Sequence, residues 1–199
     1  MKMKINEMSQ IAMFTALIAV LSQISLPLPF SPVPMTLQTF AVFFTAMVLG
    51  SRKGALVMIL YAFIGAAGFP VFSQGKAGLP VLLGPTGGYI FGFILAAWII
   101  GKIMEGAEQP SLRRSLIALL CGVTVIYLLG MGQLKLLLDL SIKEAFVMGV
   151  LPYLALELIK VTLAAYLGCA VRKAVVKAFP ETMVANETSP CHRPCHRKG

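Results

Sequence analysis

Residues 152–168 read PYLALELIKVTLAAYLG, an almost wholly apolar stretch with Glu157 and Lys160 at its centre. Three positions apart on an α-helix, these two side chains share a face, which Tyr153 joins one turn earlier. Within a membrane span an ionisable side chain costs about 2.5–3.5 kcal/mol, so it usually faces the bundle interior and marks a site. The pair therefore predicts either a polar ligand site or an ion pair that holds helices together.

The composition identifies the environment of this stretch. Of the 199 residues, 58% are hydrophobic and 13% are charged, whereas soluble domains carry about 25% charged residues. The mean hydropathy is +0.85. These few charges cannot cover a globular surface, so we expect an all-α integral membrane protein that forms one helical bundle.

Apolar runs separated by turn residues predict six transmembrane helices, at residues 8–26, 36–50, 54–72, 86–104, 112–134 and 145–172. The second run is short, because a helix needs about 20 residues to cross the hydrocarbon core. Five spans with a re-entrant segment are the alternative. We expect residues 1–177 to form the membrane domain and residues 178–199 to be a polar, disordered cytoplasmic tail.

The basic residues favour one orientation of these six helices. Ten lie at the ends and in the loops on the N-terminal side: Lys2, Lys4, Arg52, Lys53, Lys102, Arg113, Arg114, Arg172, Lys173 and Lys177. The opposite side has only Lys76, Lys135 and Lys143. This bias predicts that both termini are cytoplasmic, and it explains most of the net charge of +9 without nucleic acid.

Two connections on the predicted outer side are unusually apolar. SLPLPFSPVPM (25–35) has four prolines and cannot form a regular helix. FPVFSQGKAGLPVLLGPTGG (69–88) is long and rich in glycine. A solvated loop is normally polar, so these segments are expected to fold back on the bundle, either as lids over a cavity or as caps on helix ends.

The sequence GPTGGY (84–89) enters the fourth predicted helix. Gly87 and Gly88 let backbone N–H groups approach a ligand, and Thr86 and Tyr89 add hydroxyls. Alternatively, small residues here only allow helices to pack closely. Gln38, at the start of the second helix, either faces the cavity or caps the helix.

Ala12 and Ala16 form a small-residue pair in the first helix, which permits close approach of another helix from this chain or from another subunit. The C-terminal sequence CHRPCHRKG (191–199) either binds a soft metal or is disordered; we expect no metal site elsewhere. The chain contains no G-x-S-x-G, H-E-x-x-H or Walker A sequence. An enzyme is not expected, and any pumping is energised by another protein.

Four motifs together resemble one family: P-M-T-L-Q-T (34–39), G-x-P-V-F (68–72), L-x-G-P-T-G-G-Y (82–89) and E-L-I-K (157–160). The chain resembles the BioY family, the biotin-binding membrane subunits of energy-coupling factor transporters, up to about Lys177. The resemblance implies a six-helix subunit in a prokaryotic plasma membrane that captures biotin from outside. It also implies a transmembrane coupling protein and a pair of ATPases as partners, and no cofactor beyond the ligand.

The resemblance also implies roles for single residues. Family members usually have Asp-x-x-Lys at the positions of Glu157 and Lys160, whose side chains contact the vitamin; the longer Glu side chain departs from this pattern. Residues 86–89 match the loop over the ligand. Ala12 and Ala16 match the strip on which the coupling partner docks. A binding subunit for another small vitamin and a structural membrane subunit without a ligand are the alternatives.

Overall fold

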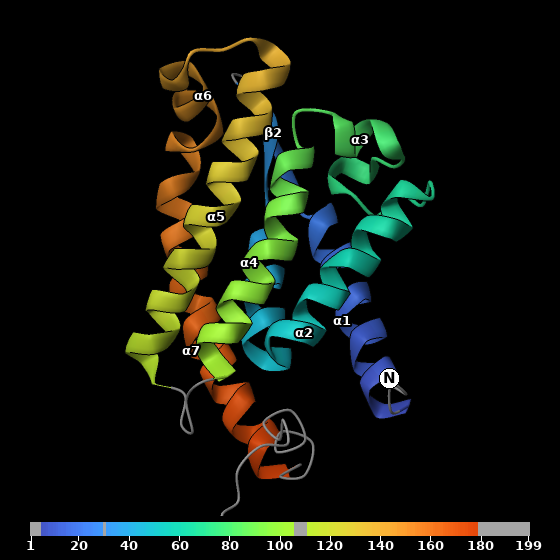
Figure 1. Ribbon diagram of the computed structural model, residues 1–199, viewed down its shortest axis with the longest axis vertical. Helices are drawn as coiled ribbons and strands as arrows, with labels where there is room; N and C mark the ends of the chain where they lie inside the picture. Colours follow the sequence, from blue (N-terminus) through green and yellow to red (C-terminus); the bar gives the residue numbers. More distant parts are fainter. Residues whose placement is uncertain (1–4, 30, 106–110, 179–199) are drawn as a thin grey trace, which may run out of the picture.

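The computed structural model describes residues 5–29, 31–105 and 111–178, with side chains to Arg172. Five long helices dominate: α1 (Ile5–Gln23), α2 (Gln38–Ala66), α4 (Gly87–Glu105), α5 (Leu112–Leu138) and α7 (Leu154–Ala178) (Figure 1). The shorter elements are α3 (Leu79–Leu83), α6 (Ile142–Gly149), the 3-10 helices η1 (Ser73–Gly75) and η2 (Leu151–Tyr153), and strands β1 (Ser25–Leu28) and β2 (Ser31–Thr36). The chain is a multi-pass membrane protein, since five helical segments of the described residues are long and apolar enough to span a bilayer.

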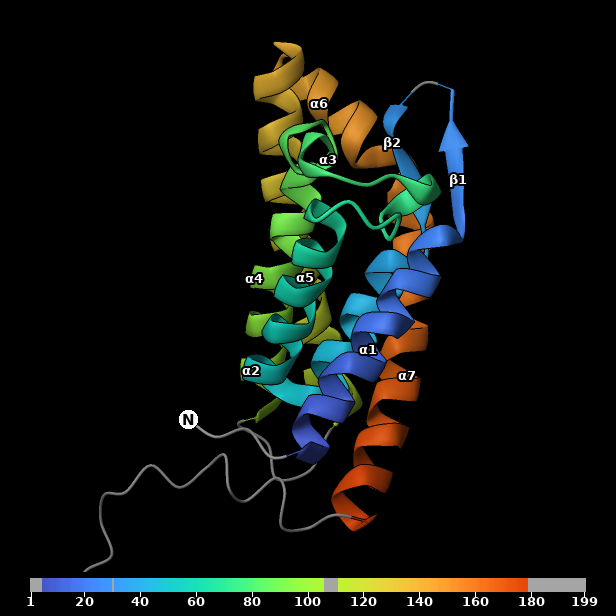
Figure 2. The same ribbon diagram turned by 90° about the vertical axis from the view of Figure 1, so that its right-hand side faces the viewer.

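The helix α2 folds back on itself at Gly50. The backbone there has φ 79° and ψ −172°, a conformation essentially restricted to glycine. In a straight helix Gln38 and Tyr61 would be about 35 Å apart, yet their side chains form a hydrogen bond of 2.7 Å. The predicted helices 36–50 and 54–72 therefore correspond to the two arms of α2, which run in opposite directions (Figure 2).

Opposite charges lie at the two helix ends that meet in this turn. Arg172 donates to the carbonyl of Met47, near the end of the first arm, at 3.1 Å. Glu105 accepts from the backbone N–H of Ser51, at the start of the second arm, at 2.8 Å. A cation at a helix C-terminus and an anion at an N-terminus both complement the helix dipole, so the turn at Gly50 is fixed from both sides.

The proline-rich segment forms a structure that the sequence did not predict. It is not helical, as expected, but β1 and β2 pair as an antiparallel hairpin that brings Ser25 opposite Thr36 and Leu28 opposite Ser31. Proline cannot donate to a strand ladder and is tolerated at sheet edges, and both strands of a hairpin are edges. The all-α prediction is thus correct for the bundle and wrong for this short segment.

The other predicted boundaries are close, with two corrections. Helices 8–26, 86–104 and 112–134 match α1, α4 and α5 to within a few residues. Span 54–72 was predicted too long, because Pro70 disfavours helical geometry at Phe69 and α2 ends at Ala66. The predicted span 145–172 is interrupted by the 3-10 helix η2, which contains Pro152 and directly precedes α7.

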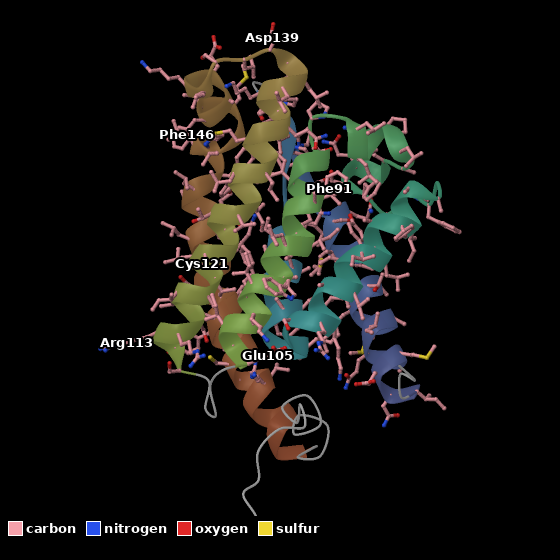
Figure 3. All side chains as sticks on the ribbon, in the orientation of Figure 1. Phe91, Glu105, Arg113, Cys121, Asp139 and Phe146 are labelled. Atoms are coloured by element: carbon pink, nitrogen blue, oxygen red, sulfur yellow. The ribbon has the colours of Figure 1, made fainter. Side chains whose placement is uncertain are left out.

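The bundle packs around α4, which lies against α2 and α5, while α7 lies against α2 and α5. Small residues such as Ala96, Ala97, Ala164 and Ala165 are buried between the helices. Large apolar side chains cover the outside, among them Phe91 and Phe146 (Figure 3). Residue 5 and the end of α7 lie at one end of the bundle, and the hairpin, α3 and α6 lie toward the other (Figures 1 and 2).

Candidate functional site

A cavity lies in the half of the bundle that holds the hairpin and α3. Its walls come from the end of β2, the start of α2, the α2–α4 connection, α4, α5, η2 and α7. The lining residues are Val33, Pro34, Thr36, Gln38, Thr39, Phe72, Ser73, Val81, Thr86, Tyr89, Ile90, Phe93, Ile126, Tyr127, Tyr153, Glu157 and Lys160. The cavity therefore combines charged and hydroxyl groups with an aromatic and aliphatic surface, as small-molecule sites do.

Glu157 and Lys160 form a buried ion pair in the cavity wall. The Lys160 Nζ to Glu157 Oε2 distance is 3.1 Å, and the side chains of Lys160 and Glu157 are 11% and 5% exposed, respectively. Lys160 also donates to the backbone carbonyl of Thr36 at 2.7 Å and to Thr39 Oγ1 at 3.1 Å. An ammonium group has three N–H donors, so these three bonds occupy all of them.

Thr39 completes the network. Its hydroxyl accepts from Lys160 and donates to Glu157 Oε2 at 3.2 Å. Both bonds to the carboxylate reach the same oxygen, Oε2, and no described residue donates to Oε1. The wall thus presents an acceptor with free capacity beside a cation whose donors are satisfied.

Tyr153 fastens the hairpin to the last helix. Its hydroxyl donates to the carbonyl of Val33 at 2.5 Å, with Ser31 Oγ 2.9 Å away. Ser31 Oγ in turn donates to the carbonyl of Met148 at 2.9 Å. The residue predicted to share the face of Glu157 and Lys160 does line the cavity, while its hydroxyl bonds to the hairpin.

Gln38 lines the cavity and does not cap α2 with its side chain. Its amide donates to the hydroxyl of Tyr61, which donates to the carbonyl of Val71 at 3.0 Å. Of the two alternatives from the sequence, the cavity-facing one is therefore correct. This chain of bonds connects the start of α2 to the α2–α4 connection.

The four residues of the glycine-rich turn divide into two pairs. Thr86 and Tyr89 line the cavity, and Tyr89 donates to the carbonyl of Gly149 at 2.9 Å. Gly87 and Gly88 are not among the lining residues. A Cβ at Gly87 would lie 1.7 Å from the carbonyl oxygen of Leu82, and one at Gly88 would lie 2.4 Å from that of Leu129. Close packing alone accounts for these glycines, and their contact with a ligand stays a prediction.

Several lining residues were missed from the sequence. Thr39 belongs to the P-M-T-L-Q-T motif, so the motif itself was an available signal. Tyr127 is a polar-tipped residue inside the apolar fifth span, and its hydroxyl makes no hydrogen bond within the described residues. The apolar wall residues Phe72, Phe93 and Ile126 carry no such signal, because apolar residues are common throughout this chain.

The predicted docking strip lies away from the cavity. Ala12 and Ala16 are exposed on α1, on the face opposite buried Phe14 and Ile18. No helix of the described residues covers them. The Cys-His sequence of the tail lies outside the described residues, and within those residues no three His, Cys, Asp or Glu side chains come together.

Comparison with known proteins identifies the family. A model of the BioY family matches residues 1–177. The chain belongs to the BioY family. Among its relatives, "Biotin transporter BioY" of Thermotoga maritima is 41% identical over 86% of this chain and 99% of the relative. "Probable biotin transporter BioY" of Pyrococcus horikoshii is 40% identical over 81% of this chain and 93% of the relative.

A solved structure supports the fold of this family member. The crystal structure of the S-component for biotin from an ECF-type ABC transporter superposes with a TM-score of 0.78. The alignment covers 86% of this chain and 95% of that one, at 23% sequence identity. At that identity the likeness supports the fold alone.

Proposed function

We propose that this protein is the biotin-binding subunit of an energy-coupling factor transporter. The observation that supports the proposal best is the buried Glu157–Lys160 pair in the wall of a cavity that is otherwise aromatic and aliphatic. Biotin has the matching chemistry, with a polar ureido group fused to an apolar sulfur-containing ring. Membership of a family whose relatives are named biotin transporters supports the same ligand.

The hydrogen-bond count favours one orientation of the ligand. Lys160 has no free N–H donor for a carboxylate, whereas Glu157 Oε1 has a free acceptor position. The ureido N–H groups of biotin therefore suit this wall better than its carboxylate does. Aromatic and aliphatic side chains such as Phe72, Phe93 and Ile126 suit the fused rings.

The proposal includes a membrane topology and partners. In this topology the two arms of α2 are separate crossings, the chain crosses a prokaryotic plasma membrane six times, and both termini lie on the cytoplasmic side. The basic residues near the turn at Gly50 and in the α4–α5 connection favour that side. Residues 1–177 form the transporting domain, and Ala12 and Ala16 on the exposed face of α1 receive the transmembrane coupling protein.

The protein binds and delivers its ligand and catalyses no reaction. Its relatives are named as transporters and the matching structure as an S-component, and the chain has no Walker A sequence. A pair of partner ATPases supplies the energy for uptake. The proposal requires no cofactor.

A titration of the purified protein tests this function. We expect saturable, one-to-one binding of biotin and no binding of other water-soluble vitamins at the same concentrations. Binding of a different vitamin would identify a subunit for that ligand. Failure to bind any member of the panel, with the bundle folded, would favour a structural subunit and contradict the proposal.

A further inference from the structure

The α2–α4 connection, residues 67–86, forms one wall of the cavity but has little structure of its own. It supplies Phe72, Ser73, Val81 and Thr86 to the lining. Its only helical parts are η1, with three residues, and α3, with five. Figure 2 shows the connection crossing the bundle beside the upper end of α1. Its position therefore depends on bonds from neighbouring elements.

Gln23, in the last turn of α1, lies within hydrogen-bond distance of three backbone groups of the connection. Its Nε2 lies 3.3 Å from the carbonyl oxygen of Pro70 and 3.1 Å from that of Phe72. Its Oε1 accepts from the backbone N–H of Gly75 at 3.1 Å. The two N–H donors of the carboxamide are shared among these two carbonyls and two acceptors of α1 itself, the carbonyl of Ala19 at 3.3 Å and Ser22 Oγ at 3.1 Å. Through Nε2 and Oε1 this one side chain still links the end of α1 to both arms of the turn at residues 70–75.

The turn that Gln23 holds positions a wall residue. Phe72 is 1% exposed and packs edge-on against Tyr61, with ring centroids 5.5 Å apart. Its ring lies over Gly65, where a Cβ would come within 2.1 Å of it. Gln23 bonds to the backbone carbonyl of Phe72, and the ring of Phe72 lines the cavity. Loss of the Gln23 bonds therefore removes one of the restraints on the position of this ring.

A second glutamine holds the other end of the connection. Gln133 on α5 donates through Nε2 to the carbonyls of Leu82, at 2.9 Å, and Gly84, at 2.8 Å. These carbonyls flank the approach to Thr86. Two carboxamides, from α1 and from α5, thus fix the wall at opposite ends. Gln23 is exposed and Gln133 is half-buried, so water competes more strongly for the bonds of Gln23.

We propose that Gln23 and Gln133 are positioning residues that keep this wall closed, and that the Gln23 end opens first to admit and release the ligand. The inference rests on the proposed function, because it assigns the path of the ligand into the same cavity. The carboxamides act through the wall and do not line the cavity. In this proposal the ligand passes the wall in both directions, so opening of the wall limits both binding and release.

The test compares Gln23→Met and Gln133→Met with the wild-type protein. Methionine keeps a similar length but removes the carboxamide. We expect biotin to dissociate from Gln23→Met about tenfold faster than from the wild type, since two or three neutral hydrogen bonds are lost. We expect its association with Gln23→Met to be faster by about the same factor. A smaller acceleration is expected for Gln133→Met. Faster association separates positioning from damage, because a merely destabilised site does not bind faster.

Gln10→Met is the matched control. Gln10 lies on the same helix, about 20 Å from Gln23 along its axis, and its side chain makes no hydrogen bond within the described residues. We expect wild-type rates for it. Unchanged rates for Gln23→Met, in a protein that binds biotin, would overturn the inference and leave the proposed function intact.

A measurement without ligand decides the question if biotin does not bind. Hydrogen–deuterium exchange in the peptide covering residues 69–78 reports the amide of Gly75, which Gln23 protects. We expect faster exchange there in Gln23→Met, with unchanged exchange in α4 and α5. Equal exchange in the variant and the wild type would contradict the positioning role, whatever the ligand is.

Discussion

All three hydrogen bonds of the Lys160 ammonium group are made to the protein. Lys160 therefore acts on the site by fixing the position of Glu157. It fixes one oxygen of the Glu157 carboxylate, Oε2, while the other, Oε1, accepts no hydrogen bond from a described residue. The pair therefore combines the two readings that the sequence left open. It joins α7 to the start of α2 through Thr36 and Thr39, and it presents an acceptor in the cavity wall.

Replacing Lys160 with methionine is expected to weaken biotin binding by about 10- to 100-fold. A hydrogen bond to a charged group contributes about 1.5–3 kcal/mol. Loss of the Lys160 ammonium group leaves the Glu157 carboxylate without a counter-charge and without a fixed orientation. Isothermal titration and thermal unfolding are measured together. The double variant Glu157→Gln, Lys160→Met removes the unpaired charge; if it folds and binds biotin as the wild type does, the pair only joins helices.

Thr39→Val is a milder test of the same network. Valine keeps the shape of threonine but removes the hydroxyl that joins Lys160 to Glu157. We expect an affinity loss of about three- to tenfold, the contribution of a typical hydrogen bond. Thr162→Val, on the exposed side of the same α7 helix that carries the pair, is the control, and an equal effect of both substitutions would argue against a role for Thr39.

At the level of single residues, the sequence predicted the charged pair and three hydroxyl residues of the cavity wall, Tyr153, Thr86 and Tyr89. It missed Thr39, whose hydroxyl joins the pair. Glu157 and Lys160 were conspicuous because charge is expensive inside an apolar span. Thr39 is polar but uncharged, and its role depends on contact with a helix more than 100 residues later. Such a contact becomes visible only when the folded chain brings α2 and α7 together.

At the level of elements, the two helical arms on either side of Gly50 could be predicted from the sequence. Two apolar runs either side of the basic pair Arg52 and Lys53 predicted two helices, and the structure has two arms of opposite direction. The hairpin was not predicted, because prolines exclude helix without specifying a strand partner. The pairing of Ser25 with Thr36 depends on register, which no local pattern in this segment sets.

Gly50→Ala is expected to destabilise the bundle by about 1–3 kcal/mol, or roughly 2–12 °C in Tm for a chain of this size. The backbone conformation disfavours any side chain, and a Cβ would lie 2.8 Å from Oε1 of Glu105. Thermal unfolding in detergent measures the effect. Gly132→Ala is the control: it lies within α5 with open space around it, so no loss of stability is expected there. Equal Tm values for the two variants would contradict this account of the turn.

At the level of the whole molecule, the cavity and the exposed strip on α1 lie in separate regions. If the cavity binds the ligand and the strip docks the partner, as proposed, ligand binding and transport should be separable. Ala12→Trp and Ala16→Trp are expected to leave the affinity for biotin within about twofold of wild type, because neither residue lines the cavity. A bulky side chain on the strip should block close approach of a partner helix and reduce uptake strongly.

Uptake of labelled biotin by cells that contain the coupling protein and ATPases measures this effect, with binding to the purified subunit measured in parallel. Leu128→Trp, exposed on α5 and therefore off the strip, controls for added bulk. Wild-type uptake by both alanine variants would exclude the strip as the docking face.

The cavity is lined by residues spread from Val33 to Lys160, and this has a consequence for how the protein is made. Of the described helices α7 is synthesised last, so a nascent chain lacks the charged wall until the other described helices have been made. Glu157 and Lys160 then leave the translocon as neighbours, and the acceptors at Thr36 and Thr39 have been synthesised long before. Chains shortened ahead of residue 157 lack the charged wall, so we expect added biotin to protect full-length chains, and not the shortened ones, from proteolysis.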